Sequence, residues 1–142
     1  MKIFRNGSQF EFEENDADVL YVPVEISPPG QNAFVRVQGM IDTGASGILI
    51  PKRLLDETPG VFPPGGAEIS DTANGSVKEA VTEVDIRLKT SIGEIIFLKG
   101  IRASVSNSCE DIVLGMSFLR YFSLLFKNGN LVDLRFDEKS VG

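Results

Sequence analysis

The feature that most constrains this chain is an alternation of apolar and polar residues with a period of two. It recurs at positions 20–26, 84–88, 95–97 and 101–105. A strand places every second side chain on the same face, so this period is typical of a strand that is buried on one side. In the 84–88 stretch, Val84, Ile86 and Leu88 would face the core, and Asp85 and Arg87 would face solvent. The pattern predicts an all-β domain.

Short helices and turns interrupt this β pattern. Helical character is confined to residues 51–57 and 116–122. The Asn-Gly pairs at 6–7 and 128–129 lie between short apolar runs and favour tight hairpin turns. Residues 58–66 are rich in Pro and Gly, which predicts a loop. A linker between two domains is disfavoured, because the strands that flank this segment are too short to form separate domains.

The length of 142 residues suits one folded domain. We expect residues 1–19 to form an N-terminal hairpin extension and residues 20–142 to form the main domain. No stretch approaches 18 apolar residues, and the N-terminus lacks the apolar segment of a signal peptide. We therefore expect no membrane association and a cytoplasmic location.

Composition narrows the possible chemistry. The net charge of −6, with 14 scattered Lys and Arg residues, argues against a nucleic-acid partner. The absence of histidine removes the usual general base of serine and cysteine hydrolases and the commonest zinc ligand. The single cysteine, Cys109, cannot form an intrachain disulfide or a thiolate cluster. Chemistry must therefore come from carboxylates, hydroxyls, lysine or backbone amides, and no metal or cofactor is expected.

One carboxylate stands in an unusual setting. An apolar approach ends at Asp42, which is followed by Thr43, Gly44, Ala45 and Ser46. The hydroxyls and the backbone amides of such a loop can donate hydrogen bonds that hold a carboxylate in a fixed plane. The alternative is an aspartate that only caps a turn with its own side chain. The triplet alone does not separate these two interpretations.

Two further segments accompany this loop. Residues 112–115 (Ile-Val-Leu-Gly) run into a short apolar segment, which is typical of a buried strand followed by a helix. Residues 71–77 contain Ala73, Asn74 and Gly75 between two strand-like regions. Taken by itself, Asn74-Gly75 indicates a turn.

Together these segments resemble, in their order and over residues 20–136, the retroviral-type (retropepsin-like) aspartic peptidases, bacterial members included. The resemblance implies a closed β-barrel or sandwich with one or two short helices and one lobe per subunit. It implies that Asp42 is catalytic and that the 71–77 segment is the flap that closes over substrate. Leu114 and Gly115 would pack beside the Asp42 loop.

The resemblance also assigns roles within the loop. Thr43 would bond across a dimer axis, Gly44 would contact substrate or support the loop, and Ser46 would hydrogen-bond the Asp42 carboxylate. Ala45 completes the loop, and Ala73, Asn74 and Gly75 would form the tip of the flap.

Aspartic peptidase chemistry needs two carboxylates that share a proton. The chain contains one complete Asp-Thr-Gly motif, since Asp71-Thr72 lacks the glycine and Asp133 is followed by Leu-Arg. We therefore expect a homodimer in which two copies of Asp42 meet on a twofold axis.

The leading hypothesis is an endopeptidase that cleaves extended polypeptide. The runner-up is an inactive peptide-binding or adapter module on the same fold. A metal-binding or purely structural β-domain is a third class, which the dispersed carboxylates disfavour. The substrate and the cleavage preference cannot be predicted from the sequence.

Overall fold

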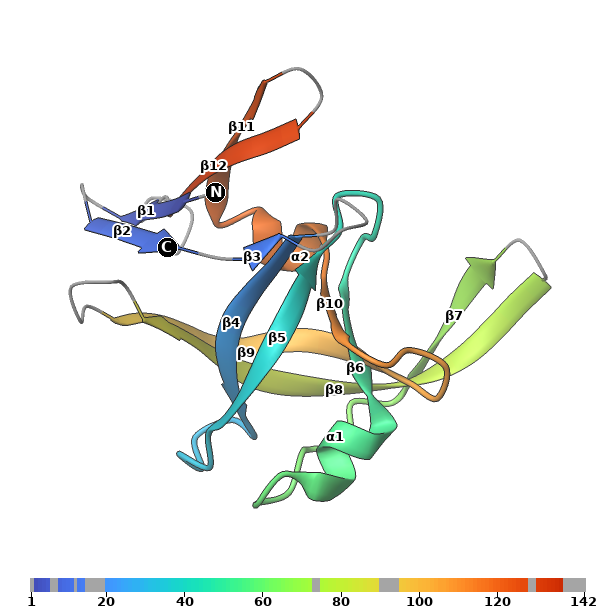
Figure 1. Ribbon diagram of the computed structural model, residues 1–142. Helices are drawn as coiled ribbons and strands as arrows, with labels where there is room; N and C mark the ends of the chain where they lie inside the picture. The colour runs from blue at the N-terminus through green and yellow to red at the C-terminus, as the bar shows by residue number, and fades with distance from the viewer. Residues whose placement is uncertain are drawn as a thin grey trace.

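A computed structural model describes residues 2–5, 8–11, 13–14, 20–72, 75–89, 95–127 and 130–136. Its centre is a closed barrel of six strands (Figure 1). The barrel strands are β4 (Leu20–Ser27), β5 (Val35–Ile41), β6 (Ile48–Pro51), β8 (Gly75–Lys89), β9 (Ile95–Ser106) and β10 (Ile112–Leu114). The expected all-β barrel with short helices is confirmed.

The barrel closes because β8 pairs back onto β4. The strand order is β4-β5-β10-β6-β9-β8, and the antiparallel β4–β8 pair completes the ring. At this seam Glu25 lies directly opposite Arg87, and their side chains form an ion pair of 2.7 Å. The Arg87 guanidinium also stacks on the Phe34 ring at 3.8 Å. Closure leaves the barrel strands without free edges.

The predicted core faces of β4 and β8 are buried. Val22, Val24 and Ile26 on β4 are each 1% exposed or less, as are Val84, Ile86 and Leu88 on β8. The prediction for the start of β9 was wrong. Ile96 and Leu98 face the core, whereas Ile95 is exposed and Phe97 is partly buried.

A bulge explains this change of face along β9. The register shifts between Val84 and Ile86 of β8, where Lys99 and Gly100 of β9 lie opposite one residue. Gly100 has φ of +60°, a conformation that favours glycine. An extra residue reverses which side chains point inward, so period two fails across it.

Asp85 lies at the same bulge and also departs from the sequence prediction. It is buried rather than exposed. One carboxylate oxygen accepts the N–H of Gly30 and the other accepts the N–H of Gly100, both at 2.9 Å. These bonds compensate for removing the carboxylate from water.

Two strands of the larger sheet, β7 (Ala67–Thr72) and β3 (Glu13–Glu14), lie outside the ring. β7 pairs antiparallel with the first half of β8, and this hairpin extends away from the barrel in Figure 1. β3 pairs with β4.

The chain ends come together in a second sheet of four strands. These are β1 (Lys2–Arg5), β2 (Ser8–Glu11), β11 (Phe122–Lys127) and β12 (Asn130–Phe136). Their order is β11-β12-β1-β2, so β12 is an inner strand and β2 and β11 are the edges. The N-terminal hairpin therefore pairs with the C-terminal strand. The turns predicted at 6–7 and 128–129 lie outside the described residues.

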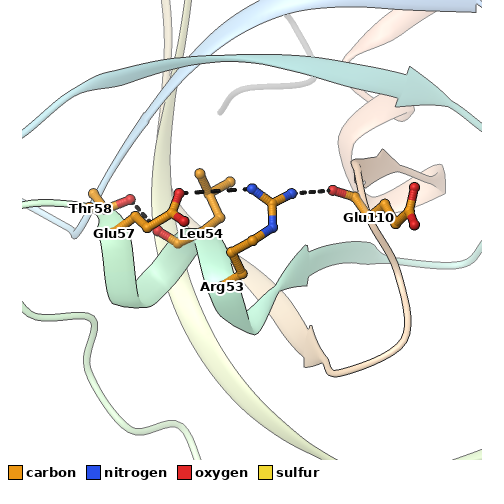
Figure 2. Close-up of polar contacts among 5 residues, drawn as sticks. All are labelled: Arg53, Leu54, Glu57, Thr58 and Glu110. Carbon is orange, nitrogen blue, oxygen red and sulfur yellow. Dashed lines mark hydrogen bonds and ion pairs between the residues drawn. The ribbon is translucent and has the colours of Figure 1, made fainter.

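Both predicted helices are present. α1 (Lys52–Glu57) ends where the Thr58 hydroxyl and N–H both donate to the Leu54 carbonyl, as Figure 2 shows for the hydroxyl. Arg53 contacts the Glu57 carboxylate and donates to the Glu110 carbonyl at 2.8 Å, which links the helix to the loop before β10 (Figure 2).

α2 (Met116–Leu119) is shorter than the predicted segment, because Phe122 already begins β11. Neither helix among the described residues has the length and apolar character needed to span a membrane. The predicted loop after α1 lies against β8, where Gly65 donates to the Val81 carbonyl and Val81 donates back to the Gly66 carbonyl.

Candidate active site

Asp42 follows the last residue of β5 and is partly buried. Its N–H donates to the carbonyl of Leu114 on β10, at 3.2 Å, so the neighbouring strand continues to hold the chain where β5 ends. The Asp42 carboxylate accepts the N–H of Gly44 at 2.9 Å. The Asp42 carbonyl accepts the N–H of Ala45 at 3.3 Å, which closes a tight turn. The local chain therefore orients this carboxylate.

The segment from Gly115 to Ser117 supports this loop from behind. Three consecutive N–H groups donate to it: Gly115 to the Gly47 carbonyl, Met116 to the Ala45 carbonyl and Ser117 to the Ser46 carbonyl, at 2.8–3.1 Å. In Figure 1 the connection between β5 and β6 lies beside α2. The loop is thus fixed by backbone bonds at its far side and has exposed residues at its tip.

Gly115 is buried at the centre of this contact. A Cβ built on it would lie 2.2 Å from the Gly47 carbonyl oxygen and 2.5 Å from the Ala45 carbonyl oxygen. Both neighbours are backbone atoms, so neither can rotate away as a side chain can. Leu114, just before it, is fully buried in the barrel. The structure thus places both predicted packing residues against the loop.

The remaining loop residues are accessible. Thr43, Gly44 and Ser46 are exposed, and Ala45 is partly buried. The predicted hydrogen bond from Ser46 to the Asp42 carboxylate is not formed within the described residues of this single subunit. Ser46 supports the loop through its backbone, since its carbonyl accepts the N–H of Ser117.

Part of the predicted flap tip can be placed. Gly75 is the first residue of β8, is exposed, and has φ of +116°. It pairs with Thr72, the last residue of β7, so the described strands meet as a hairpin at this point. Ala73 and Asn74 lie outside the described residues.

Sequence reasoning missed a polar cluster near the loop. Glu68 on β7 accepts hydrogen bonds from the Ser104 hydroxyl and from Arg102, which lies at 3.0 Å. Both residues belong to β9, which is not paired with β7. The Ser104 bond first, and then Arg102, lower the pKa of the Glu68 carboxyl below its ordinary value of 4.5. No spacing in the sequence links these residues, because they meet across β8, which pairs with both β7 and β9.

The described residues offer few ligands for a metal. No three His, Cys, Asp or Glu side chains among them gather closely enough to hold an ion. The groups around Asp42 that can take part in chemistry are the carboxylate itself, the loop hydroxyls and the backbone amides.

Comparison with known families gives one match. A family model described as "gag-polyprotein putative aspartyl protease" matches residues 31–121. This range includes the Asp42 loop, the β7–β8 hairpin and the Leu114-Gly115 strand end. Comparison with curated protein sequences found no match.

Solved structures with the same fold include two proteases. One is the EIAV protease complexed with the inhibitor HBY-793, with a TM-score of 0.56, 18% identity, and coverage of 76% of this chain and 91% of that one. The other is a retropepsin-like aspartic protease from Rickettsia conorii, with a TM-score of 0.52, 24% identity, and coverage of 84% and 93%. At these identities the similarity establishes the retropepsin-like fold.

Proposed function

The chain belongs to the gag-polyprotein putative aspartyl protease family, and on that premise we propose that it is an aspartic endopeptidase. The observation that carries the proposal is the setting of Asp42. Its carboxylate is oriented by the Gly44 N–H on a loop that Gly115 and its neighbours fix from behind. The loop residues beside it are exposed and can meet a partner subunit or a substrate.

The active site would be completed by a second copy of the chain. Each subunit contributes one Asp-Thr-Gly motif, and a twofold axis brings the same surface from both sides. The four-stranded terminal sheet lies at the end of the barrel that carries the Asp42 loop (Figure 1). Among the described residues, β12 is paired on both sides, and the edges of this sheet that are left for a partner are those of β2 and β11.

Two carboxylates at such an axis would share one proton, because like charges at that separation do not both ionise. The ionised Asp42 takes a proton from water as the water oxygen attacks the peptide carbonyl carbon. The protonated Asp42 gives its proton to the carbonyl oxygen. When the tetrahedral intermediate collapses, the C–N bond breaks and the nitrogen of the leaving amine takes up a proton from the dyad.

The substrate would bind as an extended strand between the Asp42 loop and the β7–β8 hairpin. Backbone hydrogen bonds would supply affinity, and pockets for alternate side chains would supply selectivity. We propose that Ala73, Asn74 and Gly75 form the tip that closes over it and excludes water. Thr43 would bond to the partner loop, and Ser46 would contact substrate or the carboxylate once the dimer is complete.

Cleavage of a diverse peptide pool between about pH 3 and pH 8 tests this proposal. The full chain and Asp42→Asn are compared, and the oligomeric state of each is measured in the same buffer. Cleavage by the wild type that is lost in a dimeric mutant supports the peptidase. A wild-type dimer that binds peptides, cleaves none, and still binds them after Asp42→Ala would support the inactive adapter instead.

A further inference from the structure

A pocket of about 220 Å³ lies where the base of the β7–β8 hairpin meets the Asp42 loop. Its lining includes Ser46, Gly47, Glu68, Arg102, Ser104 and Ser117. Its sides are the loop that would hold the dyad, β7 of the hairpin that would lie over the substrate, and β9, which supplies Arg102, Ala103 and Ser104. An extended peptide between the loop and the hairpin would pass this pocket.

The pocket is close enough to the catalytic residue to receive a nearby substrate side chain. Ser46 follows Asp42 by four residues, a distance of at most about 14 Å along an extended chain. An extended peptide advances about 3.3 Å per residue. The side chain in the pocket therefore belongs to a residue within about four positions of the cleaved bond.

The pocket is lined by charged side chains of both signs. Glu68 supplies a carboxylate that already accepts bonds from Ser104 and Arg102, and it retains further lone pairs. Arg102 is largely exposed and carries more N–H groups than the one that bonds Glu68. An acceptor and a donor, both charged, therefore lie side by side.

Ser117 adds a second, independent requirement. Its Oγ is buried and has no hydrogen-bond partner among the described residues. A buried hydroxyl without a partner is unfavourable, and a ligand that bonded it would remove this cost. An apolar side chain in the pocket would leave the hydroxyl unsatisfied.

We propose that this pocket is a substrate subsite selective for an amide side chain, glutamine or asparagine. The inference rests on the proposed peptidase function. An amide offers N–H donors to the Glu68 carboxylate and a carbonyl acceptor to Ser117 or Arg102. A carboxylate or an ammonium in its place would be attracted by one of these two side chains and repelled by the other, whereas a neutral amide bonds both without repulsion. At about 30 Å³ for each water-sized group, the volume suits a side chain of several atoms.

Competition between matched peptides tests the subsite. The pool cleaved by the full-length wild type identifies a reference sequence, and peptides with Gln, Glu or Met at each flanking position are digested as pairs in one tube. We expect Gln to exceed Glu and Met in kcat/KM by about 10-fold or more at one position. Because both peptides meet the same enzyme, the ratio does not depend on how much of a variant is folded.

Two variants should each lower a different one of these ratios. Glu68→Gln should raise cleavage of the Glu peptide relative to the Gln peptide by about 10-fold, and Ser117→Ala should reduce the advantage of Gln over Met by about the same factor. Glu57→Gln, an exposed carboxylate on α1 outside the pocket, is the charge-matched control and should leave the ratios unchanged. Cleavage without amide preference, or a preference that neither variant alters, would overturn the subsite and leave the peptidase proposal intact. No cleavage of any peptide by the wild-type dimer would overturn both.

Discussion

Gly115 donates its N–H to the carbonyl of Gly47 at 3.1 Å, and a Cβ added to Gly115 would lie 2.2 Å from that same oxygen. The hydrogen bond and the short Cβ distance have the same cause, which is the close approach of the Gly115 and Gly47 backbones. The chain after β10 supports the Asp42 loop so closely that no side chain fits between them. The position of the carboxylate therefore depends on a residue that lies 73 positions away in the sequence, from 42 to 115.

Replacement of Gly115 by alanine is expected to destabilise the fold. The new methyl meets two backbone carbonyls, and overpacking of this kind costs typically about 1–3 kcal/mol. Gly47→Ala is the matched control in the same contact, because its Cβ would lie 3.9 Å from Ser117 Oγ, an ordinary contact distance. Urea unfolding of both variants measures the difference. Equal midpoints for the two variants would show that the contact is not tight.

The buried carboxylate of Asp85 is expected to contribute to stability through its two bonds. Asp85→Asn keeps one oxygen acceptor and replaces the other by NH₂, so the N–H of either Gly30 or Gly100 loses its partner. A hydrogen bond to a charged group contributes about 1.5–3 kcal/mol, so the loss of one of the two bonds should cost about that much. Glu83→Gln removes a charge from an exposed site on the same strand and should change the free energy of unfolding by less than about 0.5 kcal/mol. A loss no larger for Asp85→Asn than for Glu83→Gln would contradict this account.

Glu68 is expected to make stability depend on pH in the acid range. The bonds from Ser104 and Arg102 lower its pKa in the folded state, so the ionised carboxylate favours folding. This contribution is complete above the ordinary pKa of 4.5 and is lost as the pH falls through the lowered value. The wild type should therefore exceed Glu68→Gln in stability at neutral pH, and the gap should close on acidification. A gap that widens as the pH falls would reverse the sign and refute the prediction.

Asp42→Asn is expected to preserve the fold while it removes activity. The amide oxygen of asparagine can accept the Gly44 N–H as the carboxylate does, so the free energy of unfolding should change by less than about 1 kcal/mol. Loss of the shared base and acid should reduce kcat by roughly 100- to 10,000-fold or more. Thermal unfolding and peptide cleavage on the same preparation measure both. If the mutant unfolded at a much lower temperature than the wild type, its loss of activity would reflect loss of the fold and would contradict the prediction.

The sequence predicted those parts of the fold that depend on local patterns. The alternation at 20–26 and 84–88 identified the inward faces of β4 and β8, and the apolar run at 112–114 forms the expected buried strand, β10. The prediction of the inward face failed at the bulge in β9. The four consecutive apolar residues 95–98 fit either face, and the extra residue at the bulge reverses which alternate side chains point inward. Asp85 was assigned to solvent for the related reason that its partners lie 55 and 15 residues away.

The pocket beside the loop could not be predicted for a similar reason. Glu68 on β7 meets Arg102 and Ser104 on β9 across β8, the strand that pairs with both of them. Ser117 looks like an ordinary position in a short helix until its buried hydroxyl is seen without a partner among the described residues. Sites built from such contacts leave no fixed spacing in the chain.

The central claim is that one active site takes Asp42 from each of two subunits, and subunit mixing tests it most directly. Wild type and Asp42→Asn are combined in equal amounts, allowed to exchange subunits, and assayed for peptide cleavage at constant total protein. If both carboxylates are needed, only wild-type homodimers cleave, and about a quarter of the wild-type activity remains. If a single Asp42 suffices within its own subunit, about half remains, and the shared site is contradicted.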